Sequence, residues 1–277
     1  MSVIKGIDIV NIFVTIIAVI FFFVILIVPH EFGHFITAKM LGVRVNEFAF
    51  GMGPAILQKQ GKETLYSVRI FPVGGYCALE GENEDTGDPK AFNSKPGWVN
   101  IIILLAGVTM NVITALLIVF FLLLILRLIA KGNGAQELAN IGAFQIFTES
   151  VKDSFTVVGR MGLLIFDSLK QLFTGEASIN ELSGPVGIVS AVNESASQGV
   201  MYYFMLTAIM CVNLAIVNIL PLPALDGGRI LFVIIRKITG KMISDELEAK
   251  IHMIGMALLF ALVIMITFKD VGTMFGQ

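Results

Sequence analysis

Charged side chains are scarce in this sequence, and the shortage limits what the chain can be. Asp, Glu, Lys and Arg make up 14% of its 277 residues, whereas soluble proteins have about 25%. The formal net charge is -2, so there is no excess of basic residues to bind the phosphates of a nucleic acid. These shortages argue against a soluble protein and against a nucleic-acid-binding one.

Cysteine is nearly absent as well. Cys77 and Cys211 are the only two, and they show neither the spacing of a metal site nor the pairs of a disulfide framework. Apolar residues are abundant instead: 56% of the chain is hydrophobic, and the mean hydropathy is +0.86. This composition predicts a polytopic membrane protein.

Four segments are long and apolar enough to cross a bilayer, which takes about 20 residues. They are residues 9–41, 99–129, 202–220 and 251–268. The stretch 144–173 is also long, but it carries six charged residues among apolar ones at helical spacing. Because one charge at the bilayer centre costs about 2.5–3.5 kcal/mol, we expect an amphipathic helix on the membrane or protein surface, within an extracytoplasmic region 131–200.

Residues 42–97 differ from the rest of the chain in being rich in β-forming segments. These are Val43–Phe50, Thr64–Ile70 and Tyr76–Leu79, separated by Gly51, Gly53, Pro54, Pro72, Gly74 and Gly75. Glycines and prolines at such places predict hairpins, and the acidic run Glu80–Asp88 predicts a solvated loop. The expected fold is membrane α-helical, with four transmembrane helices, a small membrane-associated β-hairpin region and an amphipathic helix.

Lysine and arginine are unevenly distributed along the chain. They are frequent in residues 42–97 and 229–250 and sparse in 130–201. By the positive-inside rule, the first two segments are expected to be cytoplasmic and both termini extracytoplasmic.

The motif His30-Glu31-Phe32-Gly33-His34 directly follows a long apolar run. On a helix, residues four apart share a face, so both imidazoles can bind one zinc while Glu31 lies beside it as a general base. The alternative is a polar helix end that anchors the span, but bilayer interfaces favour Trp, Tyr, Lys and Arg. Ionisable groups within a membrane more often serve function.

A catalytic zinc needs a third protein ligand and one open position. Asp226 is the candidate, because it follows an apolar span that Pro221 and Pro223 interrupt. Irregular backbone in a membrane is tolerated only where it is buried in protein or lines a cavity. Taken alone, a carboxylate before Gly227-Gly228 would indicate an ordinary turn.

These motifs together carry a family resemblance. The pair His30–His34 and Asn218–Gly227, with Asn213 at the matching spacing, resembles the site-2 protease family of intramembrane zinc metalloproteases, and most of all the bacterial branch of the regulator-of-sigma-E protease. Lesser matches lie at residues 50–54, 72–76, 106–111 and 183–188, so the resemblance covers nearly the whole chain.

The resemblance implies roles for particular residues. One zinc per chain would be held by His30, His34 and Asp226, with Glu31 as the general base. Further residues would contact the substrate, namely Asn213, Asn218, Pro221, Pro223, and Gly51 and Gly53 of a membrane-reentrant β-loop.

The resemblance also implies partners and a location. Substrates would be single-pass membrane proteins, such as anti-sigma factors, or remnant signal peptides, cut by regulated intramembrane proteolysis in a bacterial inner membrane. Many relatives carry PDZ domains between the second and third spans, but the stretch from Arg127 to Phe144 is too short for one. We therefore expect a single protease domain over residues 1–277.

Several alternatives stay open at this point. An unwound substrate could add as a strand to segments 48–57 and 64–70, or these could form a hairpin that covers the cytoplasmic mouth. His252 could be an extra ligand or an interfacial residue, and Asn111 could bond a neighbouring helix or support the site. The competing function is a zinc-binding membrane protein without protease activity, either a transporter or a helix-binding scaffold.

Overall fold

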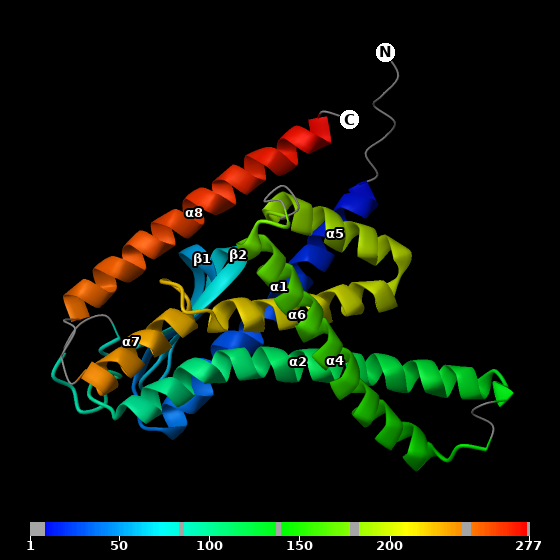
Figure 1. The fold of residues 1–277 in the computed structure, drawn as a ribbon, viewed down its shortest axis with the longest axis horizontal. Helices are drawn as coiled ribbons and strands as arrows, with labels where there is room; N and C mark the ends of the chain where they lie inside the picture. Colours follow the sequence, from blue (N-terminus) through cyan, green and yellow to red (C-terminus); the bar gives the residue numbers. More distant parts are fainter. Residues whose placement is uncertain (1–8, 83–85, 137–139, 178–182, 240–244, 276–277) are drawn as a thin grey trace.

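The computed structural model describes residues 9–82, 86–136, 140–177, 183–239 and 245–275. Its elements, in chain order, are α1 (Ile9–Met40), β1 (Val45–Gln60), β2 (Leu65–Leu79), α2 (Gly97–Gly132), α4 (Ala143–Thr174), α5 (Pro185–Gln198), α6 (Val200–Ile219), α7 (Asp226–Thr239) and α8 (Asp245–Phe275). Figure 1 shows the helices around the small sheet, with α8 along one side of the molecule.

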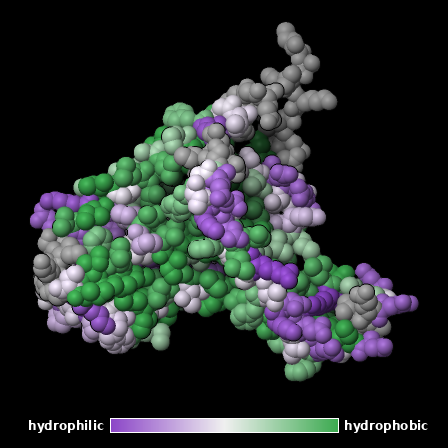
Figure 2. All heavy atoms as spheres, viewed as in Figure 1, coloured by the Kyte–Doolittle hydropathy of each residue, from purple (hydrophilic) through white to green (hydrophobic). Residues whose placement is uncertain are grey.

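Four of these helices are long and apolar enough to cross a membrane, namely α1, α2, α6 and α8. Each predicted span coincides with one of them, so the membrane α-helical fold is confirmed. Hydrophobic residues cover much of the face shown in Figure 2, whereas hydrophilic ones gather at its left edge and in a band from the upper middle to the lower right. The broad apolar surface between these polar areas suits a molecule embedded in lipid.

The helix α4 confirms the prediction of a long amphipathic helix. It packs on α2 and α6 through a face that includes Ile146, Val158 and Met161, while Phe155 and Leu164 are exposed. Arg127 of α2 donates a hydrogen bond to the Ser150 hydroxyl at 3.0 Å. The short helix α5 then leads from this region to α6.

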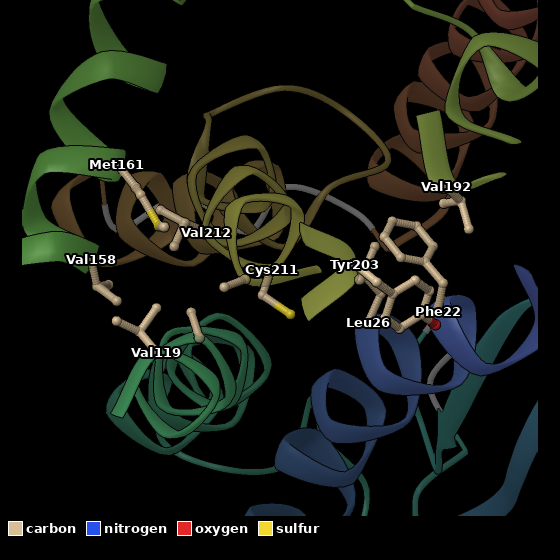
Figure 3. Packing of buried hydrophobic residues seen from close by; sticks show 11 residues of the cluster. Phe22, Leu26, Val119, Val158, Met161, Val192, Tyr203, Cys211 and Val212 are labelled. Carbon is tan, nitrogen blue, oxygen red and sulfur yellow. The ribbon is translucent and has the colours of Figure 1, made fainter. Parts of the chain in front are cut away.

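The core lies where α1, α2, α4, α5 and α6 meet. Figure 3 shows its two sides, with Val119, Val158 and Met161 on one side of α6 and Phe22 and Val192 on the other. The Tyr203 hydroxyl donates to the carbonyl of Ala18 at 2.8 Å, which satisfies the one polar atom of that buried ring. This packing fixes α6 against α1.

The strands β1 and β2 form an antiparallel two-stranded sheet with an irregular register. Residues 47–50 pair both with 65–68 and with 75–78, and residues 57–60 pair with 65–68. Both edges of 48–50 and 65–68 are therefore occupied, so of the two alternatives left open above, these residues do not offer a free strand edge. Within the described part of the chain, residues 75–78 pair on one edge only.

The predicted strand limits need a second correction. Both strands continue through glycines that were expected to end them, so that Thr64–Ile70 and Tyr76–Leu79 fall largely in the one strand β2. Gly51, Gly53 and Gly74 have φ of 88°, 83° and 88°. A glycine with positive φ can form a bulge, which bends a strand without ending it.

The acidic run after β2 is not simply a solvated loop, as was predicted. Glu82 forms an ion pair with Arg229 of α7, and its side chain is 18% exposed. Glu80 accepts a hydrogen bond from the Asn46 amide at 2.8 Å. These contacts hold the start of the run against the sheet and α7; residues 83–85 lie outside the described part of the chain.

Candidate metal centre

Three side chains from opposite ends of the sequence converge at the end of α1. His30 and His34 lie one helical turn apart on one face, with their Nε2 atoms 3.2 Å from each other. Asp226 is the first residue of α7, and its Oδ2 lies 3.3 Å from the His30 Nε2 and 3.4 Å from the His34 Nε2. The structure therefore brings together the two histidines and the carboxylate predicted from the sequence.

The three atoms fit a zinc ion in kind and in spacing. Two imidazole nitrogens and a carboxylate oxygen are a known donor set for catalytic zinc. Atoms at tetrahedral positions about 2.0–2.1 Å from a common centre lie about 3.3–3.4 Å apart, and the observed separations are 3.2, 3.3 and 3.4 Å. Among the described residues, these three side chains form the one group of His, Cys, Asp or Glu that could hold a metal.

The carboxylate of Asp226 is suited to binding a cation. Its Oδ2 is buried and accepts no hydrogen bond from the described residues. Burial raises the pKa of Asp226, but its contacts with His30 and His34 outweigh this effect and hold the pKa below its usual value. The side chain is therefore ionised at neutral pH, and its charge would be balanced by a metal.

The second helix orients both imidazoles. The Nδ1 of His34 lies 2.8 Å from the carbonyl oxygen of Ile103, so it can donate its proton there and leave Nε2 free for a metal. The Nδ1 of His30 lies 3.3 Å from the Asn111 side-chain amide. Asn111 is fully buried, and its Oδ1 has no partner; with the amide turned over, that oxygen would accept the His30 Nδ1 proton.

Gly107 lies on the same face of α2, between Ile103 and Asn111. A Cβ atom on Gly107 would come 2.3 Å from the His34 Nε2 and 2.7 Å from the His30 Cε1. Only a glycine lets the α2 backbone pass so close to both rings. Sequence reasoning missed this residue, although its spacing of four from Ile103 and from Asn111 places all three on one helical face.

A cavity of about 370 Å³ opens beside the three ligands. Glu31 lies on its wall next to His30 and His34, and Gly74 to Cys77 of β2 form another wall. A Cβ atom on Gly75 would come 3.4 Å from the Glu31 Cγ and 3.0 Å from the Ala49 carbonyl oxygen. The strand thus passes directly over the predicted general base.

A polar cluster of Glu47, Arg69 and Tyr76 supports the wall formed by β2. Arg69 pairs with Glu47 at 2.7 Å and lies over the Tyr76 ring, with 5.1 Å from the guanidinium carbon to the ring centroid. Burial, together with the neighbouring Glu47, raises the pKa of Tyr76 to about 12. Burial likewise raises the pKa of the Cys77 thiol, so that this lining residue stays protonated and unreactive.

The remaining predicted residues lie at different distances from the cavity. Asn218 lines it, with its Nδ2 3.3 Å from the His30 Nε2. Asn213 is half-buried one and a half turns earlier in α6 and is not among the lining residues. Pro221 and Pro223 lie in the irregular segment whose next residues, Ala224 and Leu225, line the cavity.

Gly51, Gly53 and His252 lie away from the cavity wall. Gly51 and Gly53 are in the bulged part of β1 and are not among the lining residues. His252 is not part of the metal group: its Nδ1 accepts a hydrogen bond from the backbone N–H of Ala224 at 2.8 Å. Two lining residues that sequence reasoning missed are Glu82 and Arg229. Arg229 could have been found, because it lies one helical turn after Asp226.

Comparison with known proteins agrees with this chemistry. Residues 18–262 match the family model described as peptidase family M50. A Clostridium acetobutylicum protein provisionally named a zinc metalloprotease is 31% identical, over 94% of this chain and 98% of its own length. The Bacillus subtilis regulator of sigma-W protease RasP is 25% identical, over 94% of this chain and 99% of its own length. These alignments span 332 and 417 positions, more than the 277 residues of this chain, so both relatives contain residues without a counterpart here.

Proposed function

The chain belongs to peptidase family M50, the site-2 proteases, and we propose that it hydrolyses peptide bonds in or near the membrane-spanning segment of single-pass membrane proteins. It is a membrane-embedded zinc metalloprotease. The observation that carries the proposal is the convergence of His30, His34 and Asp226 beside Glu31, on a cavity bounded by helices long enough to span a bilayer.

His30, His34 and Asp226 would hold one zinc per chain. When bound, zinc supplies a Lewis acid that polarises a peptide carbonyl and makes a water molecule more acidic. Ile103 and Asn111 would keep the two imidazoles turned so that each presents its Nε2. Three protein ligands leave an open position, which catalysis requires.

Glu31 would carry the proton transfers. Its carboxylate lies on the cavity wall beside the ligands, where it can accept a proton from the attacking water and return it to the amide nitrogen of the cleaved bond. The Asn218 amide, also on the wall, can donate a hydrogen bond to the carbonyl oxygen as negative charge develops there.

The substrate would bind as an added strand on β2. In a helix, each backbone N–H is already bonded to a carbonyl four residues earlier, so a transmembrane helix must unwind before it is cut. Residues 75–78 are paired on one edge only, and Gly74 to Cys77 line the cavity. An extended peptide added along that second edge would lie beside Glu31 and the metal ligands.

The chain would lie in a bacterial inner membrane with both termini outside the cytoplasm. Its two basic segments, 42–97 and 229–250, would then share the cytoplasmic side, which agrees with the ion pair between Glu82 and Arg229. In Figure 1 the start of α1 and the end of α8 lie at the same end of the molecule. Substrates would be anti-sigma factors or remnant signal peptides; the B. subtilis relative is named as a regulator of sigma-W protease.

Substrate selection in this chain would not use a PDZ domain between the second and third spans. Between these spans, α2 ends at Gly132, α4 extends from Ala143 to Thr174, and α5 begins at Pro185, so the connections 133–142 and 175–184 have ten residues each. A folded domain of typical size has at least about 50 residues. We propose that the extra residues of the relatives include such a domain.

The experiment uses purified protein in detergent with a single-span test substrate. Wild-type protein should cleave it, a zinc chelator should stop cleavage, and Glu31→Gln should be inactive while retaining its zinc. Glu194→Gln, which alters an exposed carboxylate on α5, is the matched control and should cleave normally. If the wild type binds zinc but cuts no membrane substrate, or if Glu31→Gln cleaves like the wild type, the protease proposal fails and a zinc-binding scaffold becomes the better account.

A further inference from the structure

The segment between α6 and α7, residues 220–225, leads directly into Asp226. Pro221 and Pro223 have no backbone N–H to donate. Ala224 has a φ of 73° and is the one non-glycine residue with positive φ in the described part of the chain. Alanine rarely adopts this left-handed conformation, so contacts from outside the segment must hold it there.

The first of these contacts comes from α8. The backbone N–H of Ala224 donates to the Nδ1 of His252 at 2.8 Å. The ring is therefore neutral, with its proton on Nε2, and its side chain is 12% exposed. This bond joins the strained residue of the segment to a helix that starts more than twenty residues later in the chain.

The second contact lies one turn further along the same face of α8. A Cβ atom on Gly255 would come 2.3 Å from the Pro223 Cβ and 3.0 Å from its carbonyl carbon. Glycine at this position lets the helix lie directly against the proline, and any side chain would push the two apart. A third link, Arg236 to Glu248 at 3.1 Å, ties α7 to the same end of α8.

A shift of residues 223–224 would also move Asp226, because the two glycines that follow Asp226 are tightly packed against the end of α6 and the segment itself. A Cβ atom on Gly227 would come 2.2 Å from the Ile219 carbonyl oxygen, and one on Gly228 would come 2.1 Å from that of Leu222. Glycines so close to backbone atoms leave little room for Asp226 to move independently. The position of the carboxylate thus depends on where α8 holds the loop.

We propose that His252 and Gly255 of α8 form a clamp on residues 223–224 that positions Asp226 as the third zinc ligand. His252 is then a positioning residue and not a ligand. Many other side chains of α8 face outward, among them Met253, Leu258 and Phe260, so the helix that faces lipid also sets the geometry of the metal centre. The inference rests on the proposed zinc site, but it does not require that the protein cleave any substrate.

The test compares three variants of the full-length protein in detergent, with zinc affinity measured by competition against a chromogenic chelator. His252→Leu removes the acceptor and should weaken zinc binding about 10- to 100-fold, as loss of an outer-shell partner does. His252→Asn places an acceptor oxygen where Nδ1 was and should restore most of the affinity. Ile254→Ala, an outward-facing neighbour on α8, should bind zinc like the wild type.

A second readout separates positioning from general loss of stability. In the Co²⁺-substituted protein, the visible absorption bands report the ligand set, so His252→Leu should shift them while His252→Asn keeps them. Gly255→Ala should shift them in the same direction; if it does not fold, the two His252 variants decide the matter alone. Wild-type zinc affinity in His252→Leu, or equal weakening in the Leu and Asn variants, would overturn the clamp. Wild-type protein that binds zinc but cuts nothing would instead refute the protease proposal and leave the clamp standing.

Discussion

The metal centre has two halves that are built in different ways. His30 and His34 stand on one uninterrupted helix and are oriented by Ile103 and Asn111 of α2. Asp226 follows an irregular, strained segment whose shape depends on contacts with α8. The histidine half is preorganised by helix geometry, whereas the position of Asp226 depends on two parts of the chain that are distant in sequence, the α6–α7 segment and α8. This difference predicts that the two halves respond differently to mutation.

Removing one ligand from each half should give the largest effects and test the comparison directly. His34→Ala and Asp226→Ala should both abolish cleavage. His34→Ala should weaken zinc binding by about 100-fold or more, and by about tenfold more than Asp226→Ala, since the latter keeps two preorganised imidazoles. Chelator competition measures both constants. Equal affinities in the two variants would mean that the halves are equally preorganised.

Asn213 and Asn218 of α6 allow metal binding to be separated from stabilisation of the transition state. Asn218→Ala should lower kcat by about 10²- to 10³-fold, as loss of one oxyanion donor does, with zinc affinity little changed. Asn213→Ala is the matched control and should have a smaller effect, because Asn213 does not line the cavity. If Asn213→Ala is the more damaging of the two, the proposed role of Asn218 is wrong.

A substitution at Gly107 of α2 should disrupt the preorganised half of the site, which consists of His30 and His34. Gly107→Ala would push a methyl group into both imidazoles, so it should weaken zinc binding by about 10- to 100-fold and destabilise the fold by about 1–3 kcal/mol. Gly159→Ala on α4 is the control, because a Cβ atom there meets nothing within 4 Å; it should be neutral or stabilise by about 0.4–1 kcal/mol. Thermal unfolding with and without zinc compares the pair. Unchanged zinc binding in Gly107→Ala would show that α2 can move away from the site.

The smallest effect on zinc affinity is expected from substitutions of Asn111, whose side-chain amide contacts the His30 Nδ1. Asn111→Ala should weaken zinc binding about tenfold, because the His30 ring loses the group that fixes its orientation. Asn111→Asp keeps an acceptor oxygen in the same place and should bind zinc nearly as tightly as the wild type. The comparison is again made by chelator competition, and a stronger loss in the Asp variant would mean that the amide donates rather than accepts.

The same contrast explains how much could be predicted from the sequence. The four spans and the shared face of His30 and His34 follow from hydrophobic content and from the 3.6-residue period, which depend on neighbours along the chain. Asp226 could be named as the candidate ligand because Pro221 and Pro223 interrupt an apolar span just before it. Its meeting with the histidines depends on tertiary packing.

The limits of the strands and the contacts around the metal site could not be predicted from the sequence, because they depend on tertiary structure. A glycine such as Gly51 or Gly74 permits both a turn and a bulge, and only pairing with the partner strand decides between them. The Glu82–Arg229 pair and the His252–Ala224 bond join residues far apart in the chain. No local pattern marks such pairs, so His252 could be noted as a candidate but not assigned its role.

The central claim is that two distant segments bind a single zinc ion within the membrane-embedded fold. Anomalous scattering from crystals at the zinc absorption edge tests it most directly. The account predicts one strong peak per chain, about 2.0–2.2 Å from the His30 Nε2, the His34 Nε2 and a carboxylate oxygen of Asp226. A peak at other side chains, or one that touches the histidines while Asp226 lies several ångströms away, would contradict it.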